Sequence, residues 1–180
     1  MKLYHYAPKD NTIMTEGLLS FSKSKTVDVR SYTWRGEGLK TKKDVCQWME
    51  KCFVGRSRGI RCLTEPMKWY EHSIKALKNF AEEHTLISIN VDELSADGLI
   101  ESVYVSPPIQ EIYPEVFTNP DFNGRRDEIY IKLNSVNDID FSPIDWSICD
   151  DEKGWRFAFV PYYLLVMKDG VIPPKYLKKV

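Results

Sequence analysis

A histidine between two tyrosines near the start of the chain is the first side chain whose type and surroundings could serve chemistry. His5 stands in the run Leu3–Tyr6, where the mixture of aromatic and aliphatic residues predicts a β-strand. A histidine on such a strand could hold a ligand hydroxyl through one ring nitrogen. It could equally be a half-buried residue whose nitrogens are satisfied within the protein, and the residue types leave both interpretations open.

The residues that follow predict a short helix and a return to the core. Pro8 interrupts the strand, and Ile13 with Met14 gives the next turn of chain one apolar face. Gly17 stands where a residue in the left-handed conformation commonly ends a helix. The pair Leu18–Leu19 is apolar again, so we expect it to be buried.

This order of strand, histidine, short helix and Gly-Leu pair, from Leu3 to Leu19, resembles the first conserved block of ADP-ribosyltransferase-fold proteins, including the small bacterial and phage enzymes that modify DNA. The resemblance covers the first block of the chain and not the remainder. It implies an enzyme that transfers one ADP-ribosyl group from NAD to a macromolecular acceptor without a metal. By the same resemblance, His5 would hold the ribose next to nicotinamide, and Tyr6 would face the same pocket.

Two further positions recur in that superfamily, and each has a counterpart here. A glutamate at the head of a late strand stabilises the positive charge that develops on the ribose when nicotinamide leaves. Glu128, just before the predicted strand Ile129–Leu133, is implied in that role. An aromatic side chain covers the nicotinamide ring, and Tyr32 and Trp34, in a polar segment with glycines, are implied for it.

Two departures from the family pattern bear on this expectation. Arginine-modifying members carry a second glutamate two residues before the catalytic one, and Arg126 stands at that place, so a protein arginine is not the expected acceptor. The carboxyl-terminal run from Tyr162 also resembles the late strand of the DNA-modifying group, and in that register Tyr162 or Tyr163 replaces the glutamate. The alternative function is therefore an inactive binding or inhibitory module of the same fold, acting on a partner protein.

The segment Gly55–Arg61 carries Arg56, Arg58 and Arg61 among glycine and serine. Guanidinium groups and main-chain N–H groups in such a turn could cradle a phosphate, although no Gly-Lys-Ser/Thr follows as in a P-loop. A solvated basic turn is the alternative. Arg61 leads into a predicted strand, and the family resemblance implies that it assists NAD or acceptor chemistry.

Hydrophobic periodicity predicts helices first and strands later in the chain. Thr41–Phe53 repeats apolar residues with the helical period after a Thr-x-x-Asp cap, and Thr64–Ala81 does so around a proline. From Thr85 the period is two; the predicted strands are 86–91, 99–105, 129–133, 155–160 and 162–167, with 92–98 as a turn. We therefore expect one α+β domain over residues 1–180, with helices mainly in the first half and an antiparallel or mixed sheet built mostly from the second half. The resemblance makes that architecture ADP-ribosyltransferase-like.

The composition narrows the class of partners. With Lys+Arg 25 against Asp+Glu 26, the chain has no overall field for nucleic acid or a membrane surface, although a local basic patch could still bind nucleic acid. No apolar run reaches membrane-spanning length and no signal-peptide pattern is visible, so we expect a cytoplasmic protein. The cysteines lack paired spacing, which argues against zinc and for reduced thiols that are mostly small core residues; they are Cys46, Cys52, Cys62 and Cys149.

Overall fold

The computed structural model describes residues 1–9, 12–25, 38–68, 82–114, 129–146 and 160–180. Within these ranges the protein is an α+β fold whose strands pair in antiparallel fashion and form three sheets. The expected α+β class with antiparallel pairing is therefore confirmed. None of the helices in these ranges is long and apolar enough to cross a membrane.

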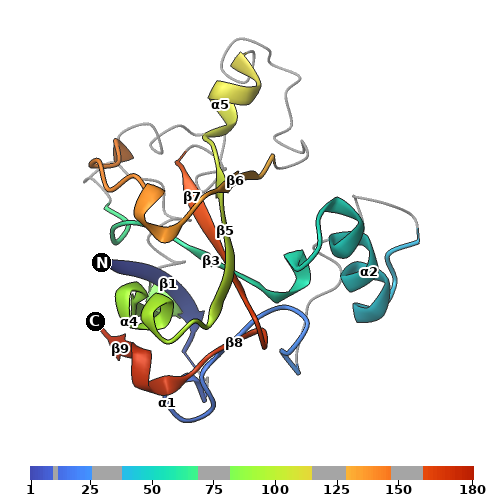
Figure 1. Ribbon diagram of the computed structural model, residues 1–180, viewed down its shortest axis with the longest axis horizontal. Helices are drawn as coiled ribbons and strands as arrows, with labels where there is room; N and C mark the ends of the chain where they lie inside the picture. Colours follow the sequence, from blue (N-terminus) through green and yellow to red (C-terminus); the bar gives the residue numbers. More distant parts are fainter. Residues whose placement is uncertain (10–11, 26–37, 69–81, 115–128, 147–159) are drawn as a thin grey trace.

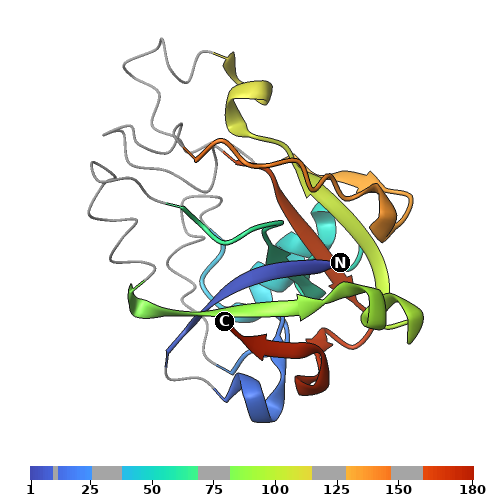
Figure 2. The ribbon, with the colours of Figure 1, turned by 90° about the vertical axis from the view of Figure 1, so that its left-hand side faces the viewer.

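The first sheet places the amino-terminal strand beside the middle of the chain. β4 (His84–Asn90) lies between β1 (Lys2–Pro8) and β9 (Leu177–Lys179), and Figure 2 shows these strands running side by side. Leu3 and Ala7 are wholly buried. Because side chains alternate between the two faces of a strand, the odd-numbered residues of β1 form its core-facing row.

The second sheet has the order β3–β7–β5–β6. Its strands are β3 (Gly59–Cys62), β5 (Ile100–Ser106), β6 (Ile131–Leu133) and β7 (Tyr162–Met167). All six residues of β7 are buried, because this strand lies between β3 and β5 and carries apolar or aromatic side chains on both faces. A third, two-stranded sheet joins β2 (Leu18–Leu19) to β8 (Val171–Ile172).

The two larger sheets cross and enclose the main core. In Figure 2 the strands of the first sheet run across the view, while β5 and β7 run steeply past them. A main-chain bridge between Tyr4 and Leu63 joins the sheets, with both N···O distances at 2.8 Å. Leu3, Val103 and Leu165 belong to one buried cluster, so side chains of both sheets fill the space between them.

The α-helices of the described ranges are α1 (Ile13–Glu16), α2 (Lys42–Cys52), α4 (Val91–Ala96) and α5 (Ile109–Ile112). Single 3-10 turns are η2 (Arg56–Arg58), η4 (Val136–Asp138) and η7 (Pro174–Tyr176). α2 stands to one side of the sheets in Figure 1. It begins at the expected cap, where Thr41 and Asp44 form a reciprocal capping box, and it buries Val45 and Met49.

Two expectations about helices are wrong in the described residues. The expected turn at 92–98 contains most of α4, because the Asn90 side chain accepts a hydrogen bond from the Glu93 N–H and caps the helix. The helix expected over Thr64–Ala81 does not begin at its proline. Residues 64–68 are irregular, since Glu65 accepts hydrogen bonds from the Trp146 ring and the Ile144 N–H, far along the chain. Residues 69–81, and 155–159 of an expected strand, lie outside the described ranges.

Within the described ranges, the expectation that the sheet comes mostly from the second half of the chain is also wrong. β1 to β4 end at or before residue 90, and β5 to β9 follow it. β3 corresponds to the strand expected at Arg61, whereas β2 has two residues, too few to show a clear period of two. Both strands pair with segments near the carboxyl terminus, which local pattern cannot reveal.

Gly17 ends α1 with φ 91° and ψ 173°, so the expected positive φ is present but ψ is extended rather than left-handed helical. A Cβ there would lie 2.5 Å from the carbonyl oxygen of Ile172. We expect Gly17→Ala to lower the free energy of unfolding by about 1–3 kcal/mol, since this backbone region is open to glycine almost alone. Urea denaturation measures the change. Gly38→Ala is the control, with no atom within 4 Å of its Cβ position, and an equal loss there would contradict this explanation.

Candidate functional site

A cavity of about 270 Å³ lies where the two larger sheets part. Its walls come from β1, from β3 with the residue after it, and from the start of β7; the lining residues are Tyr4, His5, Tyr6, Arg61, Cys62, Leu63 and Tyr162. The structure therefore brings together His5, Tyr6 and Arg61, which the sequence singled out. Tyr162, the candidate substitute for the catalytic glutamate, lies there too.

The sheets part because a histidine side chain takes the place of a main-chain hydrogen bond. Tyr4 and Leu63 exchange both main-chain bonds, so they are a hydrogen-bonded pair of an antiparallel ladder. The next such pair in register would be Tyr6 with Arg61. Instead, the Arg61 carbonyl oxygen lies 2.7 Å from Nδ1 of His5. Among the described residues the ladder between β1 and β3 stops at the bridge, and the cavity begins there.

The bond to Arg61 also fixes the state of the His5 ring. A carbonyl oxygen can only accept, so Nδ1 carries the hydrogen and Nε2 is the accepting nitrogen of a neutral ring. His5 belongs to the core-facing row of β1, and burial lowers its pKa below the usual value of 6.5 despite the opposing effect of the bond to Arg61. The ring is therefore neutral at pH 7 and suited to accept a hydrogen bond from a hydroxyl group.

Arg61 is held at the cavity by two tyrosines. Its guanidinium carbon lies 5.1 Å from the ring centre of Tyr162, and its Nη2 lies 3.4 Å from the hydroxyl oxygen of Tyr130. The two hydroxyl oxygens are 3.0 Å apart. Sequence reasoning missed Tyr130. The available signal was its place two residues after Glu128 in a strand-forming run.

The adjacent tyrosines at the start of β7 have different surroundings. Tyr162 lines the cavity, whereas the Tyr163 hydroxyl accepts from the N–H of Asp140 at 3.0 Å and donates to its carbonyl oxygen at 3.2 Å. Burial raises the pKa of Tyr163. Successive strand residues face opposite sides, so Tyr162 is the one of the pair that can reach a ligand in the cavity.

Two other lining residues have mainly structural contacts. The Tyr6 hydroxyl accepts a hydrogen bond from the Met67 N–H at 3.0 Å, and burial raises the pKa of Tyr6. Burial also raises the pKa of the Cys62 thiol far above its ordinary value, so its thiolate does not form near neutral pH. Of the thiols expected to lie mostly in the core, Cys62 is buried, Cys46 is half-buried and Cys52 is exposed. Cys149 lies outside the described residues.

A second cavity, of about 460 Å³, shares His5 with the first. Its walls come from the end of β1, from α1, from β2 and from the segment after β2; the lining residues are His5, Ala7, Pro8, Thr12, Ile13, Glu16, Gly17, Leu18, Leu19, Ser24 and Lys25. Glu16 and Lys25 form an ion pair at 3.9 Å. His5 thus borders an aromatic cavity and a larger, more polar one.

The remaining predicted site residues lie outside the described residues; they are Tyr32, Trp34 and Glu128, together with Arg126. Tyr130 follows Glu128 by two positions and contacts two residues that line the first cavity, Arg61 and Tyr162. The carboxylate assigned to Glu128 therefore stays a prediction.

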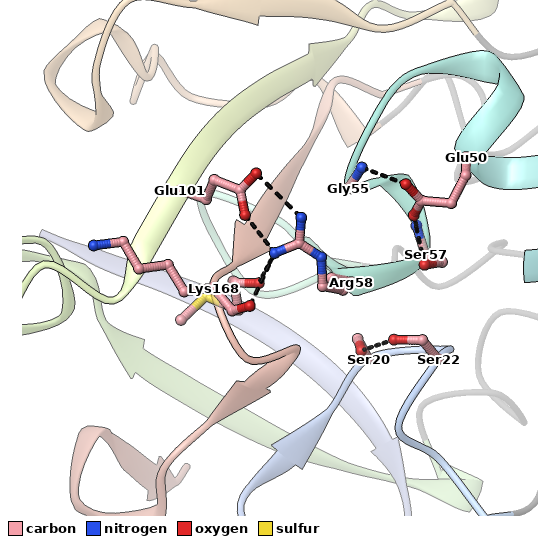
Figure 3. Close-up of polar contacts among 9 residues, drawn as sticks. Ser20, Ser22, Glu50, Gly55, Ser57, Arg58, Glu101 and Lys168 are labelled. Atoms are coloured by element: carbon pink, nitrogen blue, oxygen red, sulfur yellow. Dashed lines mark hydrogen bonds and ion pairs between the residues drawn. The ribbon is translucent and has the colours of Figure 1, made fainter.

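The arginine-rich turn is not a phosphate cradle, because a carboxylate of the protein already occupies it. Glu50 accepts from the Gly55 N–H at 2.8 Å (Figure 3). It also accepts from Ser57, at 3.1 Å from the N–H and 2.6 Å from the hydroxyl. The residue types did indicate an anion site, and the anion is the side chain of α2 that precedes the turn.

The arginines of this turn also have partners within the protein, so the alternative interpretation, a basic turn exposed to solvent, is wrong as well. Arg58 forms an ion pair with Glu101 and donates to the carbonyl oxygen of Lys168 at 2.9 Å (Figure 3). Arg56 is 6% exposed, and its guanidinium carbon lies 4.6 Å from the ring centre of Trp48. Of these three arginines, Arg61 is the one that lines the aromatic cavity.

Comparison with protein-family models, with curated proteins and with solved structures finds no match for this chain. Across the part of the chain that the structure describes, no group of three His, Cys, Asp or Glu side chains could hold a metal ion. The function is therefore inferred from the cavity and from the resemblance of the first block.

We expect Glu50→Ala to lower the free energy of unfolding by about 1–3 kcal/mol, because it removes the carboxylate that satisfies the buried N–H groups of Gly55 and Ser57. Urea denaturation measures the loss. The control is Gln47→Ala, on the exposed side of the same helix, with an expected change within about 0.5 kcal/mol. Equal losses in the two variants would assign the effect to the helix instead of the turn.

The lowered pKa of His5 makes stability depend on pH. The unfolded chain takes up a proton near the usual value of 6.5 and the folded protein only at lower pH, so the free energy of unfolding falls as the pH drops below 6.5. We expect His5→Asn, which cannot be protonated, to lose less stability than wild type between about pH 7.5 and about pH 5.5. Urea denaturation at both pH values checks this. An unchanged loss in His5→Asn would refute the assignment.

Proposed function

We propose that this protein is an ADP-ribosyltransferase that uses NAD and transfers one ADP-ribosyl group to a macromolecular acceptor. The observation that supports it most is the meeting of His5, Tyr6 and Arg61 at one cavity. A neutral His5 ring with an accepting Nε2 suits a ribose hydroxyl. The second cavity also borders His5 and offers room for the remainder of a dinucleotide.

The reaction would break the bond between ribose C1′ and the nicotinamide nitrogen. The bonding electron pair goes to the nicotinamide ring and neutralises its positive charge, while positive charge develops on the ribose. A carboxylate beside the ribose stabilises that charge, and Glu128 is the residue assigned to this role. A nucleophile of the acceptor then forms a bond to C1′ and loses its proton.

The aromatic walls of the first cavity supply the contacts that a planar ring needs. Tyr4 and Tyr162 would pack against nicotinamide. Tyr32 and Trp34, outside the described residues, would cover it. Arg126 in place of a second glutamate favours an acceptor other than a protein arginine, so the acceptor is another protein group or a nucleic acid. The cytoplasm is the compartment proposed for this reaction.

The second candidate is an inactive binding module of the same fold that acts on a partner protein. Tyr162 favours it, because the register that puts a tyrosine in place of the catalytic glutamate selects a residue that lines the cavity. In that case the aromatic cavity would receive a side chain of the partner. NAD would neither bind there nor be cleaved.

The test combines a thermal-shift titration with NAD and an assay for released nicotinamide. We expect NAD to stabilise the wild type by about 2.7 kcal/mol at a hundredfold excess over Kd, and His5→Ala to weaken binding by about tenfold. Glu128→Gln should keep NAD binding and release nicotinamide about 10²- to 10³-fold more slowly. Glu93→Gln makes the same chemical change at an exposed position of α4 and serves as the control.

Each outcome separates the candidates. A fully active Glu128→Gln variant would remove that residue from the mechanism and leave the transferase in place. The absence of any NAD-dependent shift in the wild type would overturn the transferase and favour the binding module. A stable complex with a partner protein, insensitive to NAD, would then be the expected finding.

A further inference from the structure

We propose that Glu65 is a positioning residue for the first cavity, because it holds a strap of chain, residues 140–146, against the apolar cluster that supports the cavity wall. The strap reaches Glu65 through Ile144 and Trp146. The identity of the ligand in the cavity rests on the proposed function, whereas the contacts of Glu65 do not depend on it. Ligand binding in the cavity and closure of the strap are therefore coupled.

The strap is held by side chains and not by a main-chain ladder. Residues 140–145 form neither helix nor strand, and no hydrogen bond between main-chain groups joins the strap to another described residue. At one end of the strap, the Tyr163 hydroxyl bonds both the N–H and the carbonyl oxygen of Asp140, at 3.0 and 3.2 Å. A segment held in this way opens locally when its side-chain contacts are lost.

The other end of the strap is held by the carboxylate of Glu65. Its Oε1 accepts hydrogen bonds from the ring N–H of Trp146 at 2.6 Å and from the Ile144 N–H at 3.2 Å. Its Oε2 accepts a hydrogen bond from Lys68 at 3.1 Å. Burial disfavours the charge of Glu65, but these hydrogen bonds hold the pKa of its carboxyl group below the usual value. The group is therefore ionised at pH 7, and hydrogen bonds to a charged acceptor are the stronger kind.

The strap and the cavity wall share one apolar cluster. Trp146 is 2% exposed and belongs to this cluster together with Leu63 and Tyr162, which line the first cavity. Tyr6, a third lining residue, packs against the same cluster, and its hydroxyl accepts the hydrogen bond from the Met67 N–H. Withdrawal of Trp146 would remove packing from these side chains, so the shape of the wall depends on the strap.

A ligand that packs on this wall binds the protein in which the strap is closed, as it is in the structure. The apparent affinity for the ligand therefore falls in proportion to the fraction of molecules whose strap is closed. By the same linkage, a bound ligand lowers the fraction of open molecules. Glu65 acts on binding by setting this fraction in the free protein, without touching the ligand itself.

The first experiment measures the Kd for NAD by isothermal titration calorimetry. We expect Glu65→Ala and Trp146→Phe, which both remove the bond between carboxylate and ring, to weaken binding by about tenfold each. The double variant should weaken binding no further, because both changes break one contact. Glu65→Gln keeps an acceptor oxygen and should stay within about twofold of the wild type. Asp97→Ala is the control: this carboxylate also accepts from an aromatic side chain and a lysine, Tyr176 and Lys175, but lines neither cavity, and the variant should keep the wild-type Kd.

The second experiment measures amide hydrogen exchange by NMR without NAD, so it does not depend on the proposed function. We expect Glu65→Ala to speed exchange by at least about tenfold at Asp140, at the far end of the strap, and at Met67, whose N–H bonds a hydroxyl of the cavity wall. The Leu63 amide, in the bridge between the sheets, should keep its rate. Neither Asp140 nor Met67 donates its N–H to Glu65, so faster exchange at both would report opening of the strap and loosening of the wall.

The outcomes distinguish this inference from the proposed function. Faster exchange at Asp140 and Met67 in Glu65→Ala, with no binding of NAD to the wild type, would support the role of Glu65 and overturn the transferase. Unchanged exchange at these two amides, or an NAD affinity that Glu65→Ala leaves intact, would overturn the role of Glu65. Should Glu65→Ala fail to fold, Trp146→Phe, which keeps an aromatic ring, takes its place in both experiments with the same criteria.

Discussion

The hydrogen bond from the His5 ring to the Arg61 carbonyl is the contact on which the rest of the site depends. A continued ladder would hold β1 and β3 about 4.8 Å apart, with no room between them for a ligand. The imidazole ring spans a wider gap, so the strands separate after a single bridge. The same bond determines which ring nitrogen can accept from a ligand. One contact therefore sets both the opening of the cavity and the chemical character of its central residue.

The position of Arg61 is in turn fixed from the other end of β3. Glu50 ties the turn before this strand to α2, and Arg58 ties it to Glu101 of β5 and to the chain just after β7. Gly59 begins the strand so close to its neighbour that a Cβ would lie 2.5 Å from the Leu164 side chain. The arginine-rich turn thus contributes to the site indirectly, by holding the strand that carries Arg61.

The local sequence pattern was sufficient to predict those structural features that depend only on residues close together in the chain. The strand that carries His5, the capping box of Thr41 and the need for a positive φ at Gly17 all follow from the nearby sequence. Features that depend on distant partners were missed. Glu65 accepts a hydrogen bond from the Trp146 ring instead of beginning a helix. The Tyr130 and Tyr162 hydroxyls form a hydrogen bond although the two residues lie far apart in the sequence. Residue types indicated an anion at the arginine-rich turn, but they could not reveal that the protein supplies that anion itself.

Because His5 belongs to the core-facing row of β1, the length of this strand is constrained in evolution. β1 is tied to β4 along its length and to Leu63 on its other side, so its register is fixed twice. Inserting one residue between Leu3 and Tyr4, or deleting Tyr4, would exchange the two faces of the strand from that point on and bring a tyrosine into the place of the imidazole. Substitutions at Tyr4 or Tyr6 leave the alternation intact. Evolution should therefore preserve the length of this segment more strictly than the identity of its residues.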